Sequence, residues 1–412
     1  NLPILFFTHG GSYTSGSGSL DTYITDAGLA DNAIVVTHNY RLGALGFLAH
    51  PALSSEDGEE NDDSGSSGNQ GLFDTLMALQ WTVDNAQALG GNPEQLMIFG
   101  ESAGGMTTCS LLASPLAEGL FSAALIQSAG CIWLNKDLSN STFWGESAEE
   151  QGLRLASSLD CQGNQEETLQ CMREKDEEEI FSAMSNEAGF GPNVDDVFLV
   201  GMGIELFARG EFNQVPIVAG INGNEGSFFV HSMGLSSQEE LSEALNNYGP
   251  LWGISDLETL NDLYSVEVYG DAQEAYDQFY SDVSFVCPTR TFMTQSSVHT
   301  PVHGYYYTHV PSWIPYYPSL TGWGAYHSSE LSFVFGSGDS YLTAEEIALS
   351  DAMQEAWTSL AKGNPEIPNL SSWPLFNETE GGTWIQFDSS EISVVNGVRK
   401  TECDFIDQQW LN

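Results

Sequence analysis

The sequence predicts an α/β fold, with a mostly parallel central sheet and helices on both of its faces. Short apolar runs bounded by glycine-rich turns alternate with longer stretches of helical periodicity, a rhythm typical of parallel sheets. The clearest helix is expected at Leu72–Leu89, where apolar residues recur at helical spacing before two glycines. Strands are predicted at Leu2–Thr8, Ala33–Tyr40, Gln95–Gly100, Ala124–Gln127 and Val215–Ile221.

The length and composition favour one large domain. The chain has 412 residues, of which 41% are hydrophobic, so a single α/β domain over residues 1–412 is expected. No apolar run reaches the roughly 20 residues that span a bilayer. The segment Ser54–Gly68 is acidic and rich in glycine and serine, and we expect it to form a flexible surface loop.

The charge balance is strongly acidic. The formal net charge is −47, from 57 Asp and Glu residues against 10 Lys and Arg residues. Such a chain repels polyanions, so nucleic acid and anionic lipid surfaces are not expected as partners. Two interpretations fit the composition: an ordinary solvated acidic surface, or adaptation to salt or to an acidic medium.

The cysteines and glycosylation motifs favour the secretory route. The chain has six cysteines without the Cys/His spacing of a zinc site, so no metal site is expected. An even cysteine count together with three N-x-S/T sequons, at Asn140, Asn369 and Asn377, is typical of secreted proteins.

The pentapeptide GESAG at residues 100–104 fits the G-x-S-x-G pattern of a serine nucleophile. A predicted strand precedes it, and the small residues from Ala103 onward open a predicted helix. The strained strand-to-helix turn presents the serine, and side chains at the glycine positions would collide with neighbouring elements. Ser102 is therefore the candidate nucleophile, and the helix behind it would favour developing negative charge.

A second glycine-rich turn, HGGS at residues 9–12, follows the first predicted strand. A glycine-rich turn usually has no catalytic role. When it precedes a G-x-S-x-G motif, however, it predicts an oxyanion hole. Two backbone N–H groups of the loop, which contains Gly10, Gly11 and Ser12, would join the N–H of Ala103.

The stretch from residue 71 to residue 105 resembles the signature region of type-B carboxylesterases, the family that includes cholinesterases and fungal lipases. The runs NYRLG at 39–43, GFL at 46–48 and LIQSAG at 125–130 match the neighbouring family segments. The resemblance extends to the C-terminal end of the chain. It implies the α/β-hydrolase fold and the hydrolysis of carboxylic esters.

The resemblance also supplies the other catalytic residues. The run GINGNEG at 220–226 matches the context of the family's acid, Glu225, and GAYHSSE at 324–330 matches that of its histidine, His327. The chain order of nucleophile, acid and base is that of α/β-hydrolases. Ser102 would attack the acyl carbon, His327 would transfer the proton, and Glu225 would orient His327, without metal or cofactor.

Further residues are implied by the same resemblance. Glu101, Glu330 and Ser128 would support the site without transferring protons directly. The run SNEA at residues 185–188, before FGP at 190–192, matches the acyl-pocket region. Narrow-pocket cholinesterases carry bulky aromatic residues there, so the small and polar residues predict a roomy pocket.

The sequence departs from the family pattern in three places. Ser12 stands where the family usually has glycine or alanine, and its side chain would crowd the oxyanion hole. The acidic insert at Ser54–Gly68 is longer than expected. The family segment that precedes the first strand is expected to be missing, and in cholinesterases that segment carries the aromatic residue that binds choline. Ala33–Tyr40 is therefore expected to form an exposed, aggregation-prone sheet edge.

The resemblance implies two disulfides, Cys161–Cys171 and Cys287–Cys403. The remaining cysteines, Cys109 and Cys131, are expected to be buried free thiols.

Three interpretations of function remain: an active ester hydrolase, a catalytically inactive adhesion or binding module of the same family, and a gene fragment of an enzyme. The joint presence of Ser102, Glu225 and His327 favours the enzyme, because the chemistry needs all three. Lipase, general carboxylesterase and cholinesterase activities stay open, with a small-molecule or lipid ester as substrate.

Overall fold

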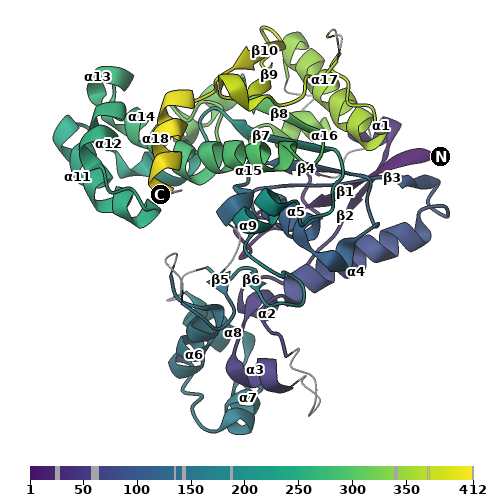
Figure 1. Cartoon of the computed structure of the whole chain (residues 1–412), viewed down its shortest axis with the longest axis vertical. Coiled ribbons are helices and arrows are strands. Elements are labelled where there is room, and N and C mark those ends of the chain that lie inside the picture. The colour runs from purple at the N-terminus through teal and green to yellow at the C-terminus, as the bar shows by residue number, and fades with distance from the viewer. Residues whose placement is uncertain are drawn as a thin grey trace.

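The computed structural model describes residues 1–23, 28–56, 65–133, 136–141, 145–185, 189–337, 342–368, 370 and 372–410. An eight-stranded sheet forms its centre, in the order β10-β9-β8-β7-β4-β3-β1-β2 (Figure 1). Neighbouring strands are parallel, except that β10 runs antiparallel to β9. The strands are β1 (Leu2–Thr8), β2 (Ile34–Thr37), β3 (Gly91–Glu101), β4 (Ala123–Gln127), β7 (Ile217–Asn222), β8 (Val302–Tyr307), β9 (Thr383–Phe387) and β10 (Ser393–Asn396).

The five predicted strands are all present in this sheet. The strand at Leu2–Thr8 is confirmed residue for residue as β1, whereas β2 is shorter than the predicted Ala33–Tyr40. Strand β1 lies between β3 and β2, and β2 ends the sheet among the described strands. The predicted position of this strand at the end of the sheet is therefore confirmed, whereas its exposure and tendency to aggregate stay predictions. A separate pair joins β5 (Lys136–Asp137) to β6 (Asn193–Val194).

Both faces of the sheet are buried, which explains why its strands are continuous apolar runs. Along β1, Ile4 and Phe6 enter one core, while Leu5 and Phe7 enter another on the opposite face. The first core packs against α4 (Gln70–Asn85), α5 (Ala103–Ala113), α9 (Gly203–Arg209), α15 (Cys287–Ser297) and α18 (Lys400–Trp410). The second packs against α1 (Leu29–Asn32), α16 (Leu331–Phe335) and α17 (Ala344–Ala361).

Two further groups of helices extend from the sheet (Figure 1). The lower group in the figure consists of α2 (Gly43–Phe47), α3 (Pro51–Glu56), α6 (Ala148–Ser158), α7 (Gln165–Arg173) and α8 (Glu177–Met184). The group at the left consists of α11 (Gln238–Tyr248), α12 (Leu257–Leu263), α13 (Val266–Tyr269) and α14 (Ala272–Ser281). Helix α10 (Ser227–Val230) packs on α14, and the π-helix η5 (Asp282–Val286) joins α14 to α15.

Short 3-10 turns complete the structure. They are η1 (Pro115–Ala117), η2 (Cys131–Trp133), η3 (His231–Met233), η4 (Gly249–Trp252), η6 (Ile314–Tyr316), η7 (Pro318–Leu320) and η8 (Glu378–Glu380). In the described part of the chain, no helix has the length and apolar character needed to cross a membrane. Within the predicted acidic loop Ser54–Gly68, residues 57–64 lie outside the described residues.

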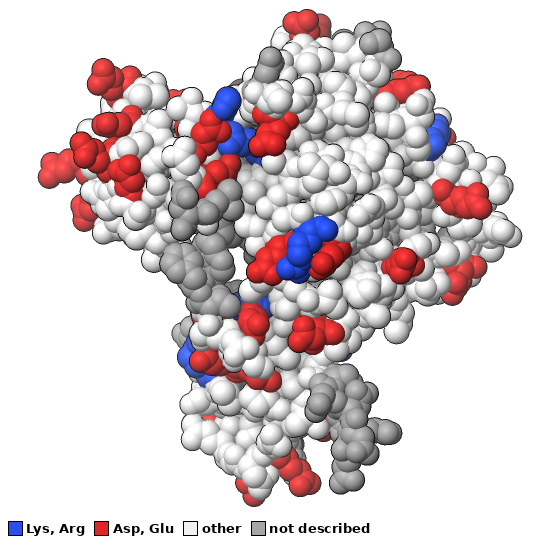
Figure 2. Space-filling view, in the orientation of Figure 1, with Lys and Arg blue, Asp and Glu red and all other residues white. Residues whose placement is uncertain are grey.

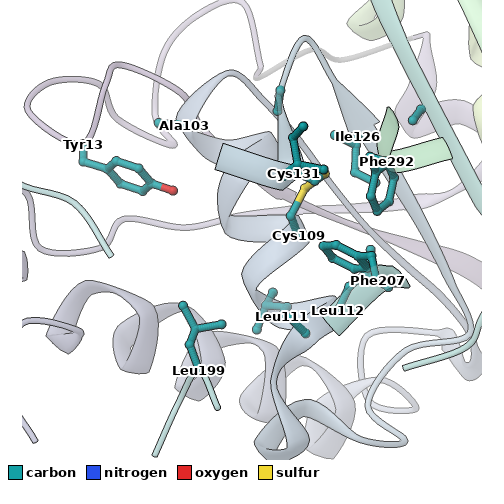
Figure 3. Close-up of a cluster of buried hydrophobic side chains, with 14 of the residues drawn as sticks. Tyr13, Ala103, Cys109, Leu111, Leu112, Ile126, Cys131, Leu199, Phe207 and Phe292 are labelled. Atoms are coloured by element: carbon teal, nitrogen blue, oxygen red, sulfur yellow. A yellow bond between two sulfur atoms is a disulfide. The ribbon is translucent and has the colours of Figure 1, made fainter. Parts of the chain in front are cut away.

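The expectation that Cys109 and Cys131 are free thiols is wrong. They form a buried disulfide, with 1.97 Å between the sulfur atoms and 5.6 Å between the Cα atoms (Figure 3). Cys109 lies in α5, which follows β3, and Cys131 begins η2, which follows β4. Because β3 and β4 are neighbouring parallel strands, the segments that follow them start at the same end of the sheet and come together. The two implied disulfides, Cys161–Cys171 and Cys287–Cys403, are also present.

On the face of the molecule shown in Figure 2, acidic side chains outnumber the few basic ones, as the composition leads one to expect. Several of the basic side chains are held by neighbouring carboxylates, so they do not form a free cationic patch. Such pairs are Arg41–Asp74, Arg173–Glu56, Lys175–Glu179, Arg290–Asp407 and Arg399–Asp282.

Candidate active site

Ser102 occupies the sharp turn between β3 and α5, as its sequence motif predicts. Its φ of 57° lies in the left-handed region, which is unusual for a residue with a side chain. The flanking glycines are required sterically: a Cβ at Gly104 would lie 1.9 Å from the carbonyl oxygen of Thr8, and one at Gly100 would lie 2.3 Å from the Gly104 carbonyl. The turn therefore presents Ser102 because Gly100 and Gly104, two residues away on either side, have no side chains.

The glycine-rich loop after β1 lies against this turn. A Cβ at Gly10 would come within 3.0 Å of the Ser102 Cβ and 2.8 Å of Glu101 Oε2, so only glycine permits this approach. Gly11, with a φ of 111°, and Ser12, with a φ of 54°, turn the chain away again. Ser12 lines the same cavity as Ser102 and Ala103. The residues predicted to form an oxyanion hole are thus brought together around Ser102.

Glu225 and His327 are also brought together. The Nδ1 atom of His327 lies 2.7 Å from Glu225 Oε2, and both side chains are buried. The backbone N–H of Asn222 donates to the other oxygen, Glu225 Oε1, at 2.7 Å. A parallel bridge between Asn224 and Tyr326 joins the loop after β7 to the segment that carries His327. The hydrogen bond between Glu225 and His327 Nδ1 fixes the orientation of the imidazole ring.

The other ring nitrogen faces a second carboxylate. His327 Nε2 lies 3.1 Å from Glu101 Oε1, and the Ser328 hydroxyl donates a 2.5 Å hydrogen bond to the same Glu101 oxygen. His327 Nε2 is buried and forms no hydrogen bond of good geometry. Among the described residues, no hydrogen bond joins this nitrogen to Ser102 Oγ. A buried ring nitrogen without a hydrogen bond is unusual and makes His327 a candidate for proton transfer.

The buried carboxylates determine the charge state of the histidine. Burial alone would lower the pKa of His327, but the negative charges of Glu101 and Glu225 and the hydrogen bond to Glu225 raise its pKa to about 9. Burial also raises the pKa of Glu101, against the opposing effects of His327 and Ser328. The rings of Phe229 and Phe285 lie 5.0 Å and 4.8 Å from the imidazole ring and shield it from water.

Glu330 and Ser128, the other two residues predicted to support the site, lie at positions different from that of Glu101. Glu330 is buried and accepts hydrogen bonds from Gln127 Nε2 at 2.9 Å and Asn222 Nδ2 at 2.6 Å, so it joins the ends of β4 and β7. Burial and the nearby charges of Glu101 and Glu225 raise its pKa to about 8. The Ser128 hydroxyl is buried, has no hydrogen-bond partner and lines the cavity around Ser102.

A cavity of about 560 Å³ opens at Ser102. Its wall includes Phe190, Gly191 and Pro192 of the predicted acyl-pocket region, while residues 186–188 of that region lie outside the described residues. Most of the remaining lining is apolar or aromatic: Tyr13, Met106, Ile132, Met202, Ile204, Phe229, Leu251, Trp252, Tyr280 and Phe285. Such a lining suits the apolar parts of an organic ester.

The sequence did not reveal several contacts at this site. Ser328 lies within the histidine motif, but its positive φ of 71° and its bond to Glu101 have no sequence signal. The contacts of Phe229 and Phe285 with His327 depend on how α10 and η5 pack together.

Comparisons with known proteins agree with this geometry. Residues 1–406 match the model of the carboxylesterase family. The chain is 31% identical to a mouse (Mus musculus) cholinesterase, over 98% of this chain and 69% of that protein. It is 32% identical to a human (Homo sapiens) cocaine esterase, over 92% of this chain and 67% of that protein.

A bacterial relative and a solved structure support the same assignment. A para-nitrobenzyl esterase of Bacillus subtilis (strain 168) is 32% identical, over 96% of this chain and 77% of its own length. A solved PNB esterase structure superimposes with a TM-score of 0.78 at 29% identity, covering 98% of this chain and 82% of the other. The chain belongs to the carboxylesterase family and is a carboxylic ester hydrolase with the α/β-hydrolase fold.

Proposed function

We propose that the chain cleaves carboxylic esters through an acyl-enzyme intermediate on Ser102, with His327 as general base and Glu225 as the residue that orients it. The supporting observation is the placement of His327, whose Nδ1 is bound to Glu225 at 2.7 Å while its buried Nε2 has no hydrogen-bond partner. Catalytic hydrogen bonds often tighten only once substrate is bound, which accommodates the missing Ser102–His327 bond.

In the first step, Ser102 Oγ attacks the acyl carbon and its proton passes to His327 Nε2. The carbonyl oxygen becomes an oxyanion, which the N–H groups of the Gly10–Ser12 loop and of Ala103 would stabilise. The proton then passes to the leaving alkoxide, which departs as an alcohol. In the second step, water attacks the acyl carbon while His327 takes its proton. The bond between the acyl carbon and Ser102 Oγ then breaks as His327 returns the proton to Oγ, and a carboxylic acid is released.

Covalent labelling tests the assignment of the nucleophile. A fluorophosphonate should modify Ser102 in the folded protein, with the adduct located by peptide mass spectrometry. Ser102→Ala should remove the label and lower kcat by roughly 10⁵–10⁶, because the three residues act as a unit. An adduct on another serine, or full activity of Ser102→Ala, would overturn the assignment. An inactive binding module would neither bind the label nor turn over ester.

We further propose a roomy acyl pocket, which favours general carboxylesterase or lipase activity over that of a narrow-pocket cholinesterase. The volume of about 560 Å³ and the apolar lining support this proposal. In a series of p-nitrophenyl esters, kcat/KM should stay level or rise from acetyl to butyryl and hexanoyl. A tenfold or greater preference for the acetyl ester would contradict it.

We also propose that the protein is secreted and glycosylated. The three disulfides fit an oxidising compartment. Asn140 and Asn377 are both exposed, whereas Asn369 lies outside the described residues. After expression through a eukaryotic secretory pathway, removal of N-glycans should increase the gel mobility of the parent protein but not of an Asn140→Gln/Asn377→Gln/Asn369→Gln variant. Equal mobility before and after treatment of the parent would contradict glycosylation.

A further inference from the structure

The segments around His327 lack charged residues. No Asp, Glu, Lys or Arg occurs from residue 291 to residue 329, a stretch that contains β8 and leads to His327. The stretch from residue 226 to residue 238, which contains α10, is also free of them. Charged residues make up 16% of the chain, so these two stretches depart strongly from the rest of the acidic protein.

The same segments expose large aromatic side chains. Tyr316 is 82% exposed, Tyr317 is 57% exposed and Phe228 is 49% exposed. With the partly buried Trp313 and Trp323, they form what we call the aromatic surface. Contiguous apolar groups exposed on a soluble protein often mark a contact with a partner or an interface.

Aromatic contacts connect this surface to the active site. The ring of Tyr317 lies 6.0 Å from Trp313, and Trp313 lies 6.2 Å from Tyr326. Trp323 continues the series, at 5.5 Å from Tyr326 and 5.8 Å from Phe228. Phe228 in turn lies 5.9 Å from the His327 ring and precedes Phe229, which lines the cavity. A molecule held on the aromatic surface would therefore be next to the active site.

Hydrogen bonds at both ends hold the segment in place. At its start, the Ser312 backbone N–H and hydroxyl donate to the two oxygens of Glu346, at 2.7 Å and 2.6 Å. At its end, the Ser227 hydroxyl donates to the Trp323 carbonyl at 2.7 Å. The Ala325 N–H also donates to Asn224 Oδ1, at 3.1 Å. The exposed tyrosines therefore project from a segment that is anchored on rigid elements.

We propose that the aromatic surface adsorbs the protein onto the surface of uncharged ester droplets and so supplies the active site with substrate from an insoluble phase. The net charge of −47 opposes binding to an anionic lipid surface, whereas a neutral droplet imposes no such repulsion. Tyr and Trp suit an apolar–water boundary, because each has an apolar ring and a polar group. The delivery of substrate rests on the proposed function, but adsorption itself does not.

Flotation of the full chain with a triolein emulsion tests adsorption. The parent protein and Ser102→Ala should float equally, since adsorption precedes chemistry. Tyr316→Ser/Tyr317→Ser should reduce the floated fraction about tenfold, because it removes exposed ring area from the interface. Vesicles containing phosphatidylglycerol should bind the parent more weakly than the triolein droplets do.

The matched control is Met77→Ser/Trp81→Ser on α4, which changes two residues of similar exposure, 74% and 55%. This variant should float like the parent protein. The tyrosine variant should hydrolyse soluble p-nitrophenyl acetate at the parent rate but emulsified tributyrin about tenfold more slowly.

Several outcomes would overturn the proposal: unchanged flotation of the tyrosine variant, equal loss in the α4 control, or tighter binding to the anionic vesicles. Sedimentation equilibrium provides a further test. If the parent protein is a dimer and the tyrosine substitutions dissociate it, the aromatic surface is an interface between two copies of the chain, and the proposal is wrong. If Ser102→Ala remained active while the tyrosine variant lost flotation, the assignment of Ser102 as nucleophile would be wrong, whereas adsorption through the aromatic surface would be supported.

Discussion

His327 Nε2 lies 3.1 Å from Glu101 Oε1, so a buried carboxylate faces the nitrogen that must accept the Ser102 proton in the proposed mechanism. Glu101 immediately precedes Ser102 in the turn after β3. Its negative charge stabilises the imidazolium that forms during the reaction. The same charge also favours protonation of the resting histidine, which then cannot act as a base.

The first prediction concerns the pH dependence of this balance. Because the pKa of His327 is raised to about 9, kcat/KM should increase with pH, with a midpoint well above the ordinary histidine value. Glu101→Gln removes the largest contribution that raises this pKa, so the midpoint should move to lower pH. The measurement is kcat/KM for p-nitrophenyl butyrate from pH 5.5 to 10.

Glu330→Gln is the control for this experiment. Glu330 bonds to Gln127 and Asn222, and its negative charge raises the pKa of His327 less than the charge of Glu101 does. Its substitution should move the midpoint less than Glu101→Gln does. Identical profiles for the parent and Glu101→Gln would show that Glu101 does not set the charge state of His327.

The second prediction concerns the disulfide behind the nucleophile. Unfolding the protein without reductant should leave Cys109 and Cys131 closed to iodoacetamide, as found by peptide mapping. Cys109→Ala/Cys131→Ala should lower the free energy of unfolding by about 3 kcal/mol, because the bridge closes a loop with a sequence separation of 22. Alkylation of either cysteine before reduction would contradict the bridge.

The third prediction tests the steric requirement at the turn. Gly104→Ala would place a Cβ 1.9 Å from the Thr8 carbonyl oxygen, so β1 and α5 must separate. We expect a loss of about 1–3 kcal/mol or more in unfolding free energy. Esterase activity should fall at least tenfold, because Ser102 moves with the turn.

Gly189→Ala is the control, since this cavity-wall glycine has no atom within 4 Å of the added carbon. It should retain the parent's thermal midpoint. A Gly104→Ala protein with parent stability and activity would show that the close packing of this turn is not required.

The fourth prediction concerns the buried ion pair between Arg399 and Asp282, the first residue of η5. Arg399 donates to the fully buried Asp282 at 2.7 Å, and Tyr264 donates to the same carboxylate at 2.7 Å. Arg399→Met leaves that charge uncompensated and should cost about 3–5 kcal/mol in a denaturant titration. It should also weaken catalysis, because η5 carries Phe285 to His327.

Asp282→Asn/Arg399→Met provides the comparison, because it removes the charge together with its partner. This double variant should recover most of the lost stability. A single variant as stable as the parent would mean that other groups neutralise Asp282.

The sequence predicted those features whose cause is local. The GESAG run predicted the turn at Ser102, because the glycine positions are fixed by steric contact with adjacent elements. The apolar run at Leu2–Thr8 predicted β1 to the residue. Glu225 and His327, in contrast, were selected by family resemblance, since an isolated glutamate or histidine carries little signal on its own.

Some contacts that depend on which strands are neighbours escaped prediction. Cys109 and Cys131 meet because β3 and β4 are neighbours, and their separation in sequence does not show this. The approach of Glu101 to His327 Nε2 likewise joins segments that lie far apart in the chain. The aromatic surface became visible only once the exposure of Tyr316 and Tyr317 was known.

The acidic surface has a consequence for the end of each catalytic cycle. Hydrolysis converts an uncharged ester into an alcohol and a carboxylate anion. At a net charge of −47, with several basic side chains already held by carboxylates, the protein's electrostatic field drives that anion outward and leaves an arriving neutral ester unaffected. The molecule thereby opposes rebinding of its own acid product, and dissolved salt, by screening this field, would weaken that clearance.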